Sequence, residues 1–215
     1  MLEEQMMVDD GSFWDGLAEK YAAQPVGNPE AFERKIAVTK SLMEPSDVLL
    51  NIGCGTGSLA LRLAGDGEHI HGLDISKEML RIANEKKAAQ QVENISFHRG
   101  TLDTFDHFGP ESLDGICAYS ILHLLEDRVA SLAWIYSHLK PGGFFVSSTV
   151  CLGNTWIPYK YLLAVMKMVG KAPPVSIVST ERLIEEMTAA GFVDIEQPEV
   201  GAENTVAFIT AKKPS

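Results

Sequence analysis

The sequence predicts an α/β protein in which a parallel sheet is covered by helices on both faces. Two observations predict this class. Short apolar segments of strand length alternate with segments of helical periodicity from residue 47 onward, and a glycine-rich turn directly follows the first apolar segment. The 215 residues, 46% hydrophobic and 22% charged, suffice for one well-buried core but are few for two full domains.

The elements of the first half follow from local signals. Residues 13–21 and 29–43 have helical spacing, and Asn28 followed by Pro29 is typical of a helix start. The apolar run 48–52 then predicts a strand, and Gly57 opens a helix to about residue 64. A strand at 70–73, a helix at 77–90 and a strand near 95–98 continue the alternation.

The second half repeats this rhythm and then interrupts it. We predict a strand at 113–118, a helix at 128–139 and a strand at 144–150, which follows the turn formed by Pro141, Gly142 and Gly143. Residues 153–177 contain three prolines and an apolar patch at 161–169, which either lines a substrate pocket or packs on the sheet. The order returns with a helix at 180–190, which Gly191 ends, and strands near 192–195 and 205–210.

We therefore expect a single domain over residues 1–215. It divides into N-terminal helices (1–45), a βαβ core that binds a cofactor (46–150), an insertion that is a candidate lid (151–178), and a C-terminal helix with two strands (179–215).

The charge balance and the apolar runs exclude several classes of function. A net charge of −11 and a pI near 5.0 oppose binding to nucleic acid, which needs clustered Lys and Arg. No apolar run approaches the roughly 20 residues that span a bilayer. The acidic start lacks a secretory signal, so we expect a cytoplasmic protein. The three cysteines have no metal-ligand or disulfide spacing.

The strongest motif joins the first strand to a helix. Gly53, Gly55 and Gly57 form GxGxG, with Cys54 and Thr56 between them. Glycines at this position allow a tight turn, the approach of a ligand to the backbone, and close packing of helix on strand. The exposed N–H groups of such a loop bind anionic groups.

A carboxylate follows about 20 residues later. Asp74 ends the second strand, where it can accept both hydroxyls of a ribose. Loop and acid together predict a nucleoside-containing cofactor. Binders of NAD favour GxGxxG, but position 58 is Ser58, which weakens the dinucleotide alternative.

The motifs resemble those of a known family. The segments Asn51-Ile52-Gly53-Cys54-Gly55-Thr56-Gly57, Leu73-Asp74-Ile75-Ser76-Lys77-Glu78-Met79-Leu80, Leu113-Asp114-Gly115-Ile116 and Leu139-Lys140-Pro141-Gly142-Gly143 occur in the order found in class I S-adenosylmethionine-dependent methyltransferases. They are most similar to the ubiquinone and menaquinone biosynthesis branch. The resemblance implies a Rossmann-like, seven-stranded and mostly parallel sheet with a final antiparallel strand, the cofactor S-adenosylmethionine, and a small-molecule methyl acceptor.

The resemblance also implies roles for individual residues. The methionine part of the cofactor would lie along the glycine loop, Asp74 would hold the ribose, and the adenine would contact the residues that follow. The implied cofactor-binding set is Asn51, Gly53, Cys54, Gly55, Gly57, Asp74, Ile75, Met79, Thr101, Leu102 and Tyr119.

Two positions depart from the family pattern. Asn51 replaces the usual acid, so it accepts a hydrogen bond but carries no charge to pair with the cofactor's ammonium. Thr101 stands where the family has an acid beside the adenine amine. The departures leave open a non-catalytic or regulatory module that binds the cofactor. The glycine loop and Asp74 leave open a second alternative, a nicotinamide-dependent oxidoreductase.

Few residues are candidates for the chemistry itself, because a sulfonium methyl is already activated and needs mainly alignment. His123 follows the fourth strand and is either a candidate base or a histidine packed at a helix start. The resemblance implies that Tyr21 covers the cofactor; the alternative is a tyrosine packed in the core. His69 and His71 share one face of a strand, but no carboxylate lies at ligand spacing, so we predict no metal site. The sequence does not predict the oligomeric state.

Overall fold

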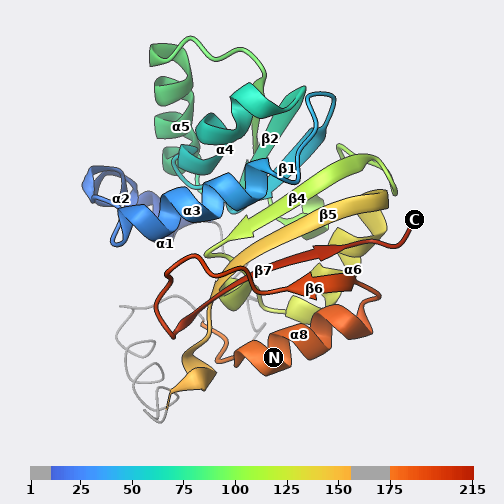
Figure 1. Cartoon of the computed structure of the whole chain (residues 1–215). Coiled ribbons are helices and arrows are strands. Elements are labelled where there is room, and N and C mark those ends of the chain that lie inside the picture. The colour runs from blue at the N-terminus through green and yellow to red at the C-terminus, as the bar shows by residue number, and fades with distance from the viewer. Residues whose placement is uncertain (1–10, 156–174) are drawn as a thin grey trace, which may run out of the picture.

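A computed structural model describes residues 11–155 and 175–215 of the chain. Its centre is a seven-stranded sheet in the order β3-β2-β1-β4-β5-β7-β6 (Figure 1). The chain moves outward from β1 in one direction through β2 and β3, and in the other through β4 and β5. The strand order therefore reverses between β1 and β4, where α/β sheets of this type bind their ligands.

The first five strands are parallel and β7 runs against its two neighbours. This confirms the α/β class, the Rossmann-like sheet and the final antiparallel strand. The strand bounds are β1 (Val48–Ile52), β2 (His69–Asp74), β3 (Ile95–Arg99), β4 (Leu113–Tyr119), β5 (Leu139–Val150), β6 (Val193–Glu196) and β7 (Val206–Lys212).

Helices cover both faces of the sheet (Figure 1). On one face lie α3 (Pro29–Lys40), α4 (Ser58–Leu63) and α5 (Lys77–Ala89); on the other lie α6 (Arg128–His138) and α8 (Thr180–Ala189). The short helices α1 (Ser12–Asp15) and α2 (Ala18–Ala23) pack beside α5. The side chains of Asn28, Ser76, Asp127 and Ser179 each accept a hydrogen bond from a backbone N–H at the start of α3, α5, α6 and α8.

Each face of the sheet buries its own apolar core. Between the sheet and α3 and α4 lie buried residues that include Ile36, Leu59, Leu63, Ile70 and Val146. Between the sheet and α6 and α8 lie Leu132, Ile135, Phe145, Leu183 and Met187, among others. Along β5, Phe144 and Val146 face one core and Phe145 faces the other, as expected of a strand that is buried on both faces.

Some element boundaries differ from the prediction. The helix predicted at 13–21 is two short helices, because the chain makes a turn at Gly16 and Leu17. The helix predicted at 29–43 ends at Lys40. The strand predicted at 144–150 begins earlier, because Leu139 already pairs with Leu113 before a register irregularity in β4.

The candidate lid is described only at its ends, where Leu152–Asn154 form a 3-10 helix. The apolar patch predicted at 161–169 lies outside the described residues. Among the helices of the described residues, none has the length and apolar character needed to cross a bilayer.

Candidate functional site

The glycine motif forms the turn between β1 and α4, at the reversal point of the sheet. Gly53, Gly55 and Gly57 all have positive φ angles, of 61°, 53° and 76°. The turn is fixed from within because the Gly57 N–H donates to the Cys54 carbonyl, and it is fixed to β2 because the Cys54 N–H donates to the Leu73 carbonyl, both at 3.0 Å. The loop is thus held rigidly at the carboxyl ends of two adjacent strands.

Asp74 connects the end of β2 to this loop. Its Oδ2 accepts a hydrogen bond from the Gly55 N–H at 2.8 Å, and its Oδ1 accepts one from the Ser76 N–H at 2.9 Å. Burial raises the pKa of this carboxyl, while the surrounding N–H groups act in the opposite direction. Each carboxylate oxygen can accept a second hydrogen bond, so the side chain can still receive ribose hydroxyls.

Gly55 and Gly57 differ in what surrounds them. A Cβ at Gly57 would lie 2.8 Å from Phe97 Cζ and 3.0 Å from Ala83 Cβ. This glycine therefore permits the start of α4 to pack closely against β3 and α5. Among the residues that the structure describes, a Cβ at Gly55 would meet one atom within 4 Å, Tyr21 Cε1 at 3.9 Å. Space is therefore open above Gly55, as required where a ligand approaches the backbone.

Tyr21 lies beside this open space, although it is on the N-terminal helix α2. Its side chain is 53% exposed, and partial burial and the Asp74 carboxylate raise the pKa of its hydroxyl. The structure therefore places Tyr21 next to the loop and to Asp74, and its role as an aromatic cover stays a prediction.

Asn51 contributes an unpartnered acceptor near the loop. The residue is 2% exposed. Among the described residues its Oδ1 has no hydrogen-bond partner, and its Nδ2 makes one long contact, 3.5 Å to the Cys117 carbonyl. A buried amide oxygen without a partner is costly. Together with the open space above Gly55, it fits a ligand that brings a donor such as an ammonium group.

The residues predicted to surround an adenine have several partners within the protein. Met79 is buried against Ala18 and Ile82, in a small core beneath the N-terminal helices. Leu102 is buried in the core of the opposite face. Thr101 caps the 3-10 helix Leu102–Thr104, with its N–H donating to Thr104 Oγ1 at 3.0 Å.

Asp15 contacts the same region from α1. Its Oδ1 accepts hydrogen bonds from Ser76 Oγ at 2.6 Å and from the Glu78 N–H at 3.1 Å. Ile75, between Asp74 and Ser76, is half-buried. The N-terminal helix thereby fixes the turn that follows β2. Sequence reasoning missed Asp15, because no local pattern connects residue 15 to residue 76.

The end of β4 presents two more predicted residues. Tyr119 donates or accepts a hydrogen bond with Thr39 Oγ1 at 2.8 Å and contacts the Lys35 carbonyl at 3.2 Å, so its hydroxyl anchors α3. His123 is 8% exposed, and its Nδ1 has no hydrogen-bond partner in the part of the chain that the structure describes. Burial lowers the pKa of His123 to about 4, which keeps the imidazole neutral at physiological pH.

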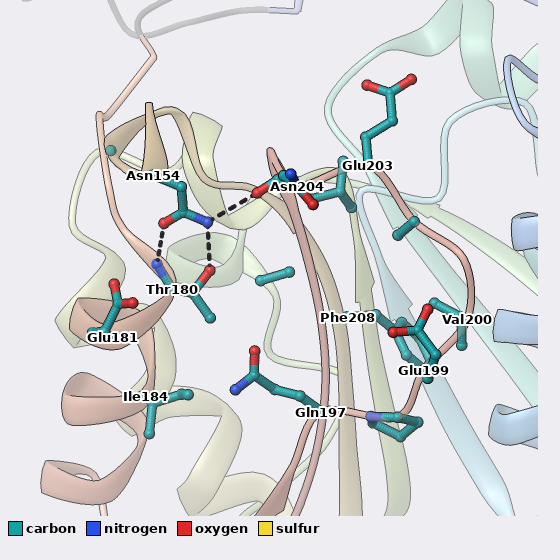
Figure 2. A pocket seen from close by; sticks show the side chains of 15 residues that line it. Asn154, Thr180, Glu181, Ile184, Gln197, Glu199, Val200, Glu203, Asn204 and Phe208 are labelled. Atoms are coloured by element: carbon teal, nitrogen blue, oxygen red, sulfur yellow. Dashed lines mark hydrogen bonds between the residues drawn. The ribbon is translucent and has the colours of Figure 1, made fainter. Parts of the chain in front are cut away.

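A separate hollow of about 680 Å³ lies between the ends of β5 and β7 and the start of α8. Figure 2 shows Asn154 bridging two parts of its wall, with hydrogen bonds to Thr180 and to the Asn204 carbonyl. Its lining includes Glu181 and Glu199 but none of the predicted site residues. The hollow is therefore distinct from the loop at β1 and β2.

Comparisons with known proteins agree with this geometry. The family described as "Methyltransferase domain" matches residues 49–143. This stretch begins in β1 and ends within β5, so it contains both the glycine loop and Asp74. Residues 49–143 therefore match a methyltransferase domain, in agreement with the resemblance to the class I S-adenosylmethionine-dependent methyltransferases.

Individual relatives relate this methyltransferase domain to the ubiquinone and menaquinone biosynthesis branch. A demethylmenaquinone methyltransferase of Symbiobacterium thermophilum is 31% identical over 142 residues, which cover 62% of this chain and 55% of that protein. An O-methyltransferase of Penicillium expansum, cnsE, is 29% identical over 195 residues, covering 87% of this chain and 66% of that protein. The chain spans from 40% to 66% of the length of several curated relatives.

A solved structure shows the same fold at low sequence identity. Phosphoethanolamine N-methyltransferase 2 of Haemonchus contortus, in complex with S-adenosyl-L-methionine, superposes with a TM-score of 0.74. The match covers 98% of this chain and 59% of that chain at 18% identity.

Proposed function

We propose that this methyltransferase transfers the methyl group of S-adenosylmethionine to a small, apolar or amphipathic acceptor. The observation that supports this proposal is the hydrogen bond from the Gly55 N–H to Asp74 Oδ2. It joins the acid that we propose to bind the ribose to a loop with open space above it. The unpartnered Asn51 Oδ1 adds an acceptor for the cofactor's ammonium group.

The protein's contribution is mainly binding and alignment. When bound, the cofactor supplies an electrophilic sulfonium methyl, which an acceptor atom takes by in-line displacement. Asp74 would hold the ribose hydroxyls, and Gly55 would allow the ligand close to the backbone. Tyr21 would cover the ligand and exclude water.

His123 is the candidate to receive a proton from the acceptor. Its neutral ring offers an unpartnered nitrogen, Nδ1, for a hydrogen bond. With a pKa of about 4 it is a weak base, so it suits acceptors that lose their proton readily or need orientation alone. We therefore expect its loss to lower the rate without abolishing it.

The apolar character of the acceptor is inferred from the sequence at 161–169. A net charge of −11 opposes recognition of phosphate polymers, so nucleic acid is a poor acceptor for this chain.

The test is a turnover assay with isotopically labelled S-adenosylmethionine and a panel of acceptors. The panel contains small phenols, thiols and amines, together with peptides and RNA. Formation of S-adenosylhomocysteine with a small acceptor supports the proposal. Methylation of peptides or RNA alone would contradict the acceptor class. Binding of the cofactor without turnover on any acceptor would favour the non-catalytic alternative.

A further inference from the structure

Four histidines gather on one face of the sheet, at its β2–β3 edge. His69 and His71 on β2 share their face with Ser96 and His98 on the neighbouring β3. His107 joins them from the loop that leads to β4. Residues 69 and 71 alone gave no metal-ligand pattern in the sequence, but the period of two along β3 adds His98 to the same face.

Three of these side chains point at a common position. One ring nitrogen from each of His71, His98 and His107 lies within 4.8 Å of the others. The closest pair is His71 Nδ1 and His98 Nε2, which are 2.9 Å apart. The rings pack against one another, with centroids 4.8 Å apart for His98 and His107 and 5.3 Å apart for His71 and His107.

The surroundings hold the cluster in place. Phe105 contacts the His98 ring edge-on, and Phe108 contacts His71 in the same way, at centroid distances of 5.3 and 4.7 Å. His71 and His98 are half-buried on rigid strands, while His107 is exposed on the loop. Two fixed donors and one adjustable donor at the surface are a suitable arrangement for capturing an ion from solution.

Imidazole binds metals in its neutral form, which predominates above the ordinary histidine pKa of about 6.5.

We propose that His71, His98 and His107 bind one divalent transition-metal ion of the zinc class. Imidazole nitrogens suit Zn²⁺ and its neighbours in the first transition row, whereas Mg²⁺ and Ca²⁺ prefer oxygen. At a Zn–N distance of about 2.0–2.1 Å, tetrahedral ligand nitrogens are roughly 3.3 Å apart. The His71–His98 pair must therefore open slightly, and the exposed His107 must close toward it.

Such an ion would fasten the loop to the sheet edge. Between β3 and β4 the chain crosses this face with a single 3-10 helix, Leu102–Thr104, and no α-helix. The fourth coordination position is left for water or for His69, whose ring centroid lies 4.5 Å from that of His71. The site lies on the face of the sheet, whereas the glycine loop lies at its carboxyl edge.

The experiment is a titration of tag-free, metal-free full-length protein with Zn²⁺ in competition with a chromophoric chelator. The wild type and His98→Gln and His107→Gln variants are compared with His138→Gln, which alters a histidine stacked on Trp134 outside the cluster. Circular dichroism of each metal-free variant verifies folding, and the exposed position of His107 makes that variant safe for the fold.

We expect one Zn²⁺ per chain in the wild type and in His138→Gln. His98→Gln and His107→Gln should each weaken binding at least as much as the roughly 10–100-fold that indirect changes around a metal cause. Co²⁺ should give the visible absorption of a tetrahedral nitrogen site. Absence of stoichiometric binding, or equal binding by folded His107→Gln and wild type, would overturn the proposal.

Discussion

Because the space above Gly55 is open, we predict that a methyl group placed there affects the stability of the fold and the binding of the cofactor differently. Within residues 11–155 and 175–215, the new Cβ of Gly55→Ala meets only Tyr21 Cε1, at 3.9 Å, so this part of the protein has room for it. The remaining cost to folding is the left-handed conformation, since φ is 53°, and this amounts to about 1–2 kcal/mol. The free energy of unfolding should fall by that amount and no more.

The same methyl group occupies the space where the cofactor would approach the loop. Overpacking of a fitted contact costs about 1–3 kcal/mol, which corresponds to a loss of affinity of roughly 5- to 150-fold. The assay is calorimetric titration with S-adenosylhomocysteine, together with chemical denaturation of the free protein.

Gly142→Ala is the matched control for this substitution. Gly142 has a φ of 79° and one neighbouring atom within 4 Å of a new Cβ, Ser215 Oγ at 3.5 Å. It should lose a similar amount of stability and keep full affinity. Unchanged affinity in Gly55→Ala would refute the assignment of this space to the ligand.

Three further predictions concern Tyr21, His123 and Glu186. Because Tyr21 is half-exposed, Tyr21→Ala should leave the melting temperature almost unchanged and weaken S-adenosylhomocysteine binding measured by calorimetry; unaltered binding would remove Tyr21 from the site. The folded-state pKa of His123 is about 4, below the roughly 6.5 of an unfolded histidine, so the unfolded chain binds the extra proton between these values. The free energy of unfolding should therefore fall as the pH drops from about 6.5 to about 4. Denaturation measured across this pH range should show about 3 kcal/mol less of that fall in His123→Gln. The same dependence of the unfolding free energy on pH in the variant and the wild type would contradict this effect of burial. Glu186 forms a buried ion pair with Arg128 at 2.6 Å, so Glu186→Ala should cost about 3–5 kcal/mol in denaturation experiments, whereas the exposed Glu185→Ala should cost little; equal losses would refute the importance of burial.

Much of the fold was predictable because its signals are local. The run from Val48 to Ile52 and the glycines that follow specify a strand and a turn within ten residues. The caps Asn28 and Ser179 likewise lie directly before the helices they begin. The break at Gly16 was not predicted, because apolar spacing continues across it.

The site was predictable only where its residues belong to the motifs. Gly55 and Asp74 are 19 positions apart, and parallel strand topology alone brings their ends together. Asp15 reaches Ser76 through the packing of α1 on α5, and His107 reaches His71 through a loop. Such contacts depend on tertiary structure, and the spacing of residues along the sequence does not predict them.

The proposed function requires that Asp74 and the glycine loop hold S-adenosylmethionine. The most direct measurement is parallel calorimetric titration of the protein with S-adenosylmethionine, S-adenosylhomocysteine and NAD, repeated on Asp74→Ala. Asp66→Ala serves as control, since Asp66 pairs with Lys40 and lies just before β2, at the amino end of the strand that Asp74 ends. We expect S-adenosylmethionine and S-adenosylhomocysteine to bind to the wild type and to Asp66→Ala, and this binding to be lost in folded Asp74→Ala. Binding of NAD alone, or undiminished binding by Asp74→Ala, would contradict it.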